Sequence, residues 1–216
     1  MKKMLALLLA LVMVLSLAAC ASSQPAAAST ETAETTETTE SAAEESAEAP
    51  AESGKTYTVG VCQLVQHEAL DAATQGFIDA LKEELGDAVT VDVQNASGDS
   101  VNCGTIVNGF VSKGVDLIMA NATPALTAAV SATADIPILG TSITAYGVAL
   151  DIDDFNGTVG GNVSGTSDLA DLQAQAQMIL DWFPETKTVG LLFCSAEPNS
   201  RYQIDEVRKA LEAQGV

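Results

Sequence analysis

From residue 55 onward the hydrophobic pattern of the chain alternates between strand-like and helix-like segments. The run 57–64 is β-prone, and in residues 69–85 the apolar side chains recur every three or four positions, as they do on one face of a helix. The pattern continues with strands at 89–93, 115–120 and 136–140 and helices at about 100–113 and 123–133. Continuous apolar strands suit burial on both faces. The pattern therefore predicts an α/β fold, with a Rossmann-like parallel sheet and helices on both of its faces.

Two of the predicted helices have recognisable beginnings. Asp99 is placed to cap the helix at 100–113, and Thr123 to cap the next one, with Pro124 in its first turn. The apolar side chains of the first of these helices are expected to face the sheet. They are Ile106, Val107, Phe110 and Val111.

Residues 151–165, rich in Asp, Asn and Gly, interrupt the alternation. A helix at 169–183, a strand at 188–194 and a helix at about 199–214 then restart it. Trp182, near the end of the first of these helices, is expected in the core. We interpret this part as a crossover to a second, similar lobe, of which only the beginning is present.

The first twenty residues indicate where the chain works. Two lysines, an apolar run shorter than the ~20 residues of a membrane-spanning helix, and a small-residue site ending on Cys20 are typical of a bacterial lipoprotein signal. In this interpretation Cys20 receives a diacylglycerol and becomes the new N-terminus. The alternative is an ordinary secretory signal with an accidental cysteine. We expect an extracytoplasmic protein that is lipid-anchored to the bacterial cell membrane.

Residues 21–54 contain only Ala, Ser, Thr, Glu, Gln, Pro and one Gly. Such a segment has too little apolar surface to bury for its burial to offset the entropy lost on ordering. We therefore expect a disordered acidic tether. The predicted organisation is a signal peptide at 1–20, the tether at 21–54, a first ligand-binding lobe at 55–160, and the crossover with a partial second lobe at 161–216.

The charge of the chain excludes one class of partner. The formal net charge is −20, and residues 55–216 carry 7 basic and 21 acidic side chains, a balance of −14. A surface of this sign repels nucleic acid, so we expect no nucleic-acid partner.

Cysteine and histidine usage offers little for catalysis. Beside Cys20, the chain has Cys62, Cys103 and Cys194, an odd number with wide spacing that matches neither a disulfide framework nor a metal motif. We expect Cys62 and Cys194 to be buried as small hydrophobic residues. A nucleophilic Cys–His pair with His67 stays open as an alternative, although nothing around these residues supports it. With one histidine and without a phosphate loop or nucleophile elbow, we predict no enzyme, no metal and no cofactor.

Polar side chains follow the ends of the predicted strands, where open parallel sheets bind their ligands. Backbone N–H groups and hydroxyls at helix N-termini accept a carboxylate, and Asp168 and Glu197 can hold an ammonium group, so the set suits a zwitterion such as an amino acid. Taken singly, Thr123, Ser167 and Asn199 are explained as well by helix capping. The candidate ligand-binding residues are Gln63, His67, Thr123, Thr141, Asn162, Ser167, Asp168, Asn199 and Ser200.

Four segments resemble those of a known family. They are Val59–Ala73 (VGVCQLVQHEALDAA), Ala122–Ala125 (ATPA), Gly160–Asp168 (GGNVSGTSD) and Glu197–Ser200 (EPNS). They are similar to the substrate-binding lipoproteins of ABC importers with a type I periplasmic-binding fold, in particular the TrpX-like group. The resemblance covers the chain from about residue 56 to residue 216.

This resemblance implies two Rossmann-like lobes that close on a small ligand, often an aromatic amino acid, and hand it to an ABC permease. It also implies that the candidate residues other than His67 face the cleft. Because family members continue through most of a second lobe, we expect this chain to be a C-terminally truncated form. Two alternatives stay open: a ligand-sensing module for a membrane signalling partner, and a sugar or nucleoside receptor of the same fold.

Overall fold

The computed structural model describes residues 54–216; the predicted signal peptide, nearly all of the tether and Cys20 lie outside the described residues. It contains a five-stranded parallel sheet in the order β2-β1-β3-β4-β5. The strands are β1 (Tyr57–Gln63), β2 (Val89–Asn95), β3 (Leu117–Asn121), β4 (Ile138–Ile143) and β5 (Val163–Ser167). The predicted α/β class is confirmed.

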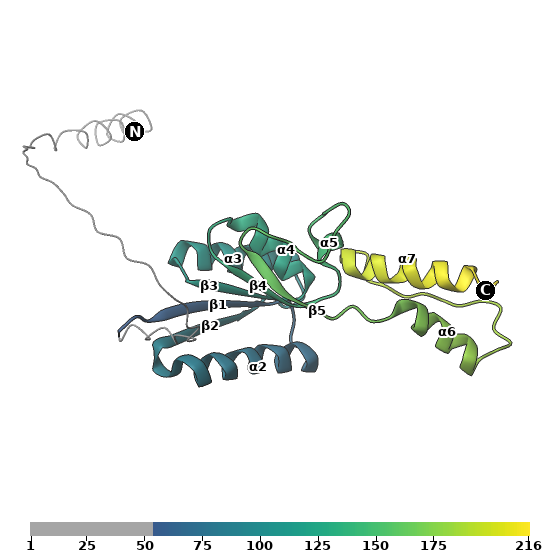
Figure 1. The fold of residues 1–216 in the computed structure, drawn as a ribbon, viewed down its shortest axis with the longest axis horizontal. Coiled ribbons are helices and arrows are strands. Elements are labelled where there is room, and N and C mark those ends of the chain that lie inside the picture. Colours follow the sequence, from purple (N-terminus) through teal and green to yellow (C-terminus); the bar gives the residue numbers. More distant parts are fainter. Residues whose placement is uncertain (1–53) are drawn as a thin grey trace, which may run out of the picture. The chain divides into compact units, whose positions relative to one another are not determined.

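Helices cover both faces of this sheet (Figure 1). The helices of the described residues are α2 (Glu68–Leu85), α3 (Ser100–Lys113), α4 (Thr123–Ala132), the short α5 (Tyr146–Ala149), α6 (Leu172–Trp182) and α7 (Pro198–Glu212), with a 3₁₀ turn at Gly86–Ala88. Helices α3 and α4 lie on one face, and α2 lies on the other. Each of these three helices connects two parallel strands, as the alternation of the sequence predicted.

The larger apolar cluster lies between the sheet and helices α3 and α4. Val107 and Phe110 are fully buried in it, and Ile106 and Val111 are partly buried against it, so the predicted inner face of this helix is confirmed. Helix α3 packs closely on β1, as the space at Gly60 shows: a Cβ added there would lie 2.6 Å from the ring of Phe110. Glycine at this strand position therefore makes room for the aromatic ring.

The smaller cluster lies under α2 on the opposite face. It is formed by Val59, Val61 and Met119, with Phe77 and Leu81 of α2 packed against it. The C-terminal end of α2 contributes less than its apolar pattern predicted. Leu85, the last residue of that pattern, is 37% exposed.

Strand β5 was not predicted. It pairs in parallel with β4, with Val163 opposite Ile138, and it carries one apolar residue in the sequence Val-Ser-Gly-Thr-Ser. The strand forms because β4 supplies its hydrogen-bonding partners. The segment itself has no hydrophobic run from which a strand could be predicted. The sheet thus continues past residue 160, where we predicted the first lobe to end. The division into lobes stays a prediction.

The predicted strand at 188–194 is wrong for this structure, which assigns it no strand. A strand needs a neighbour for its N–H and C=O groups, and among residues 54–216 no strand pairs with this segment. Leu192 is 97% exposed, and Cys194, expected to be buried, is exposed as well. Trp182, expected in the core, is 76% exposed because α6 packs mainly against α7 and no sheet covers it.

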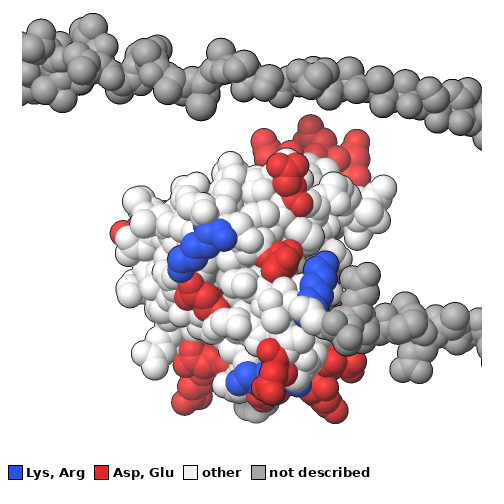
Figure 2. Space-filling view, turned by 90° about the vertical axis from the view of Figure 1, so that its left-hand side faces the viewer, with Lys and Arg blue, Asp and Glu red and all other residues white. Residues whose placement is uncertain are grey.

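Basic side chains are few and scattered on the described surface. Figure 2 shows the end of the molecule where the strands begin, and there they lie singly among acidic and uncharged groups. One ion pair joins Lys113 Nζ to Asp92 Oδ2 at 2.6 Å. Within residues 54–216, no helix combines the length and apolarity required to cross a bilayer.

Candidate functional site

The carboxyl ends of the parallel strands form one edge of the sheet, and most of the candidate residues lie there. They are Gln63, His67, Thr123, Thr141, Ser167 and Asp168. The strand register places Gln63 of β1 beside Asn121 of β3, and Asn121 beside Thr141 of β4. We predicted that Thr141 follows the strand. Because β4 continues to Ile143, Thr141 lies inside the strand instead.

A polar network joins β1 and β3 to α2. The side-chain amide of Gln63, which is buried, donates to Asp71 Oδ1 at 2.6 Å and to the carbonyl of Val65 at 2.9 Å. It accepts from Thr74 Oγ1 at 2.7 Å, and Asn121 Nδ2 donates to the same Thr74 hydroxyl at 2.9 Å. Gln63 therefore has its hydrogen bonds inside the protein and positions the first turns of α2 over the strands.

The start of α4 differs from the starts of the two preceding helices. His67 Nδ1 and Asp99 Oδ1 accept hydrogen bonds from backbone N–H groups of α2 and α3 at 3.2 and 2.8 Å, so both helices have side-chain caps. The cap position of α4 is Ala122, which has no side chain for this role, and Thr123, predicted as the cap, is the first helical residue instead. The positive end of α4 is thus available to an anion.

Two polar atoms beside the start of α4 are buried without a partner. They are Oγ1 of Thr123 and Oδ1 of Asn121, in residues that are 1% and 0% exposed. An unsatisfied buried group of this kind costs about 1–3 kcal/mol. A hydroxyl donates to a carboxylate and an amide oxygen accepts from an ammonium group. These two atoms are therefore complementary to the two charged groups of an amino acid.

Three of the five non-glycine residues with positive φ in the described part of the chain lie at the same edge. Ser97, Ala122 and Ser142 are non-glycine residues with φ values of +57°, +87° and +56°. They follow β2, follow β3 and lie near the end of β4. Such conformations cost about 1–3 kcal/mol each and are concentrated at ligand sites and switch regions. Ser97 also borders an open hollow of about 790 Å³ between α2 and the ends of β1 and β2.

The last part of the edge is the junction of β4 and β5. The hydroxyl of Tyr146 donates to the carbonyls of Gly140 and Thr166 at 3.1 and 3.3 Å, and burial raises the pKa of Tyr146 to about 12. The hydroxyl of Ser167 donates to the carbonyl of Thr144 at 2.9 Å. These bonds hold the end of β5, from which the chain leaves the sheet toward α6 and where the exposed Asp168 follows.

One candidate lies at the other end of the sheet. The side-chain amide of Asn162 donates to the carbonyls of Ile136 and Thr133 at 2.7 and 3.2 Å, beside the amino end of β4. The expectation that Asn162 lies at the carboxyl edge is therefore wrong. Its bonds tie the loop before β5 to the loop before β4.

The remaining two candidates lie in the first turn of α7. Ser200 Oγ accepts a hydrogen bond from the backbone N–H of Cys194 at 3.0 Å. Asn199 Nδ2 donates to Glu197 at 3.4 Å, and Asn199 Oδ1 is a third buried polar atom without a partner in the described residues.

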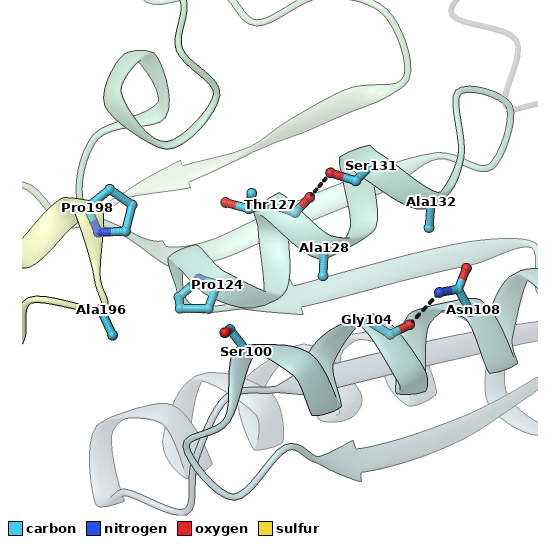
Figure 3. Close-up of a pocket in the computed structure, with 10 residues that line it drawn as sticks. All are labelled: Ser100, Gly104, Asn108, Pro124, Thr127, Ala128, Ser131, Ala132, Ala196 and Pro198. Carbon is cyan, nitrogen blue, oxygen red and sulfur yellow. Dashed lines mark hydrogen bonds between the residues drawn. The ribbon is translucent and has the colours of Figure 1, made fainter.

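A groove of about 370 Å³ runs between α3 and α4 (Figure 3). Ala196 and Pro198, from the start of α7, line the same groove as Pro124 of α4, so the two helix starts lie near each other. The groove walls consist mostly of small side chains, such as Gly104 and Ala128, and none of the nine candidate residues lines it. Its polar side chains include Asn108, Thr127 and Ser131, and each of these already donates a hydrogen bond to a backbone carbonyl of its own helix.

Sequence reasoning missed several residues of the site. Asn121, Thr74 and Asp71 belong to the polar network, and Tyr146 and Thr144 to the β4–β5 junction. Only Asn121 carried a signal, as an amide directly at the end of an apolar strand. Within residues 54–216 no group of three or more His, Cys, Asp or Glu side chains is arranged to hold a metal ion.

The parallel sheet with helices on both faces is that of proteins with the type I periplasmic-binding fold. The chain belongs to the family of ABC transporter substrate-binding proteins, whose model matches residues 58–216. The predicted family resemblance is thereby confirmed. Members of this family bind ligands and are not enzymes, as the sequence predicted.

Two relatives, one described as tyrosine-binding and one solved with L-Trp, are over a third identical to this chain across the aligned residues. A tyrosine-binding protein of Clostridioides difficile (strain R20291) is 37% identical over 162 residues, which are 72% of this chain and 46% of the relative. The ABC domain from Streptococcus pneumonia in complex with L-Trp is 36% identical, with a TM-score of 0.69, over 75% of this chain and 55% of that chain.

An open, ligand-free structure is similar as well. It is a substrate-binding protein with adhesive properties from Clostridium difficile, 36% identical, with a TM-score of 0.57, over 74% of this chain and 55% of that chain. This chain spans about half the length of the relatives it matches.

Proposed function

We propose that this chain is the ligand-capturing part of an extracytoplasmic, lipid-anchored receptor of an ABC importer, and that its ligand is an aromatic amino acid. The membership of the family and the identity of 37% to a tyrosine-binding protein support this assignment. The signal-like N-terminus ending on Cys20 supports the lipid anchor.

The observation that carries the proposal is the start of α4. This helix has no side-chain cap, and beside it the Thr123 hydroxyl is buried without a partner. In the proposed complex the ligand carboxylate lies there, held by the helix N-terminus and the hydroxyl. The ammonium group lies toward the amide oxygen of Asn121 and the carboxylate of Asp168.

The start of α7 provides the opposite side of the proposed site. Asn199 lies in its first turn and has a buried, unpartnered amide oxygen, and this turn lies near the start of α4. Capture then consists of binding at the edge of the sheet, followed by closure about the segment after Ser167, with no covalent chemistry.

Ligand binding by the full chain is testable with saturation-transfer NMR, which detects weak complexes. L-tyrosine and L-tryptophan are expected to show saturation transfer and to compete with each other, whereas galactose and adenosine are not. Thr123→Val is expected to weaken binding at least tenfold, because a hydrogen bond to a charged group contributes about 1.5–3 kcal/mol.

The matched control is Thr105→Val, the same substitution at an exposed position of α3 away from the carboxyl edge. It should leave binding unchanged. Transfer to the sugar or the nucleoside but not to the amino acids would refute the ligand class. Equal affinities for Thr123→Val and Thr105→Val would refute the placement of the carboxylate.

Two further measurements test the rest of the proposal. The chain made in a bacterial host is expected to fractionate with membranes, and Cys20→Ser is expected to release it. Ligand-loaded protein should stimulate ATP hydrolysis by its reconstituted permease. A ligand-competent protein without this effect would favour a sensory role instead.

A further inference from the structure

Cys62 and Cys103 lie far apart in the sequence and meet in the core. Cys62 is the residue before the last one of β1, and Cys103 lies in the first turns of α3. Both are 0% exposed and belong to the same apolar cluster. Their wide spacing had given no reason to pair them.

The packing of α3 on β1 explains why they meet. Phe110 of α3 lies over Gly60 of β1. From Phe110 back to Cys103 the helix covers about 10 Å, and from Gly60 forward to Cys62 the strand covers about 7 Å. The helix runs back along the strand, so both displacements point toward the carboxyl edge. Cys62 shares a sheet face with Gly60, and Cys103 shares a helix face with Phe110, which brings the two thiols together.

Both residues are free, buried thiols in this structure, and they interact with each other. The Cys62 thiol donates a hydrogen bond to the sulfur of Cys103; this bond and burial raise the pKa of the Cys62 thiol. The same bond lowers the pKa of the Cys103 thiol. Because both thiols are fully buried in the folded chain, exchange with an external disulfide has to take place while the chain folds, before α3 closes over β1.

We propose that Cys62 and Cys103 form an intramolecular disulfide that joins β1 to α3 when the chain folds in an oxidising compartment. The oxidant is a disulfide, either of a dithiol oxidase or of glutathione. One of the two cysteine thiolates attacks it and expels one thiolate. The other thiol then loses its proton and attacks the protein sulfur of the mixed disulfide, which expels the second thiolate. Two protein thiols thus lose two protons and two electrons, and the oxidant becomes two thiols.

The bond has a structural consequence for the site. It closes a loop of about 40 residues that contains α2 and β2, and it fixes the end of β1 directly beside Gln63. The polar network under α2 would then be held by a covalent bond. This inference goes beyond the proposed function and relies on it only for the location of the chain outside the cytoplasm, in an oxidising compartment.

Peptide mapping tests the bond directly. The full chain is refolded from its reduced, denatured state in a mixture of reduced and oxidised glutathione, alkylated in denaturant and digested with trypsin. Cleavage after Lys55, Lys82 and Lys113 places the two cysteines on the separate peptides 56–82 and 83–113. We expect these peptides to be joined and Cys194 to be alkylated. Recovery of the two peptides unlinked, each alkylated, would overturn the proposal.

Thermal unfolding provides a second readout. Protein refolded with glutathione is expected to melt about 10 °C above protein refolded with a phosphine reductant, because the bond restricts the unfolded chain. The variant Cys62→Ala/Cys103→Ala should show no difference, and Cys194→Ala, the control, should behave as the wild type. Equal melting temperatures for the two wild-type preparations would also count against the bond. Neither readout depends on ligand binding, so failure of the proposed function leaves both unaffected.

Discussion

The substitution Gly165→Ala tests the junction of β4 and β5. Gly165 has a φ of +148°, and a Cβ at this position would collide with the carbonyl oxygen of Gly140 and the hydroxyl of Tyr146. The carbonyl belongs to the backbone of the adjacent strand and cannot rotate away. Strand β5 therefore has to move, which breaks the hydrogen bonds from Tyr146 to Gly140 and Thr166.

The cost follows from these contacts. Overpacking against a fixed neighbour costs about 1–3 kcal/mol, and the positive φ costs about 1 kcal/mol or more for a residue with a Cβ. We expect Gly165→Ala to lower the free energy of unfolding by about 3 kcal/mol. For a folded part of this size, the melting temperature then falls by roughly 6–12 °C. Circular dichroism during thermal and urea unfolding measures both quantities.

The matched control for this test is Gly104→Ala in α3. A Cβ at Gly104 meets nothing within 4 Å, and alanine is favoured over glycine inside a helix by about 0.5–1 kcal/mol. This variant should therefore be slightly more stable than the wild type. A Gly165→Ala protein that melts within 2 °C of the wild type (roughly the assay error), or an equal loss in both variants, would refute the reasoning.

Three further predictions concern pH and the polar network. Burial raises the pKa of Tyr146 to about 12, above the value of about 10 for an unfolded tyrosine. The stability that the neutral Tyr146 hydroxyl contributes is therefore complete below pH about 10 and is lost as the pH rises toward 12. Urea unfolding across this range should show this loss in the wild type and not in Tyr146→Phe. A hydrogen bond from Lys113 lowers the pKa of Asp92, so this ion pair stabilises the fold above pH about 4, and the stabilisation is lost on acidification. Because both side chains are substantially exposed, Lys113→Ala should lower the free energy of unfolding by less than about 1 kcal/mol at pH 7. Gln63→Leu leaves Thr74 without its acceptor and should cost about 2 kcal/mol in urea unfolding; an unchanged midpoint would contradict the network.

The strands of this chain show what a sequence can predict. Strands β1 to β4 are apolar runs between amphipathic helices, and their approximate positions follow from that pattern alone. The segments 163–167 and 188–194 were both misjudged, in opposite directions. The first is polar and forms a strand because β4 lies beside it, and the second is apolar and forms none because no strand pairs with it. Strand formation at these two places depends on the neighbour, which local sequence does not contain.

The error at Asn162 has the same origin. When residues 160–165 are interpreted as a crossover, Asn162 follows the last strand and belongs at the carboxyl edge. With β5 at Val163–Ser167, it precedes a strand and lies at the amino edge. Gln63, His67 and Thr123 lie at the carboxyl edge as expected, because parallel strands bring all their carboxyl ends to one edge regardless of their order in the sheet.

Hydrogen-bond satisfaction separates the candidates at this edge further. Gln63 uses both its amide nitrogen and its amide oxygen inside the protein, and His67 caps α2. A ligand could recruit either side chain only by breaking an internal bond, at a cost that offsets the new one. Thr123 has no such bond to lose, and it stands at a helix start that lacks a cap. A polar ligand therefore gains most at Thr123, while Gln63 and His67 hold the neighbouring helix in position.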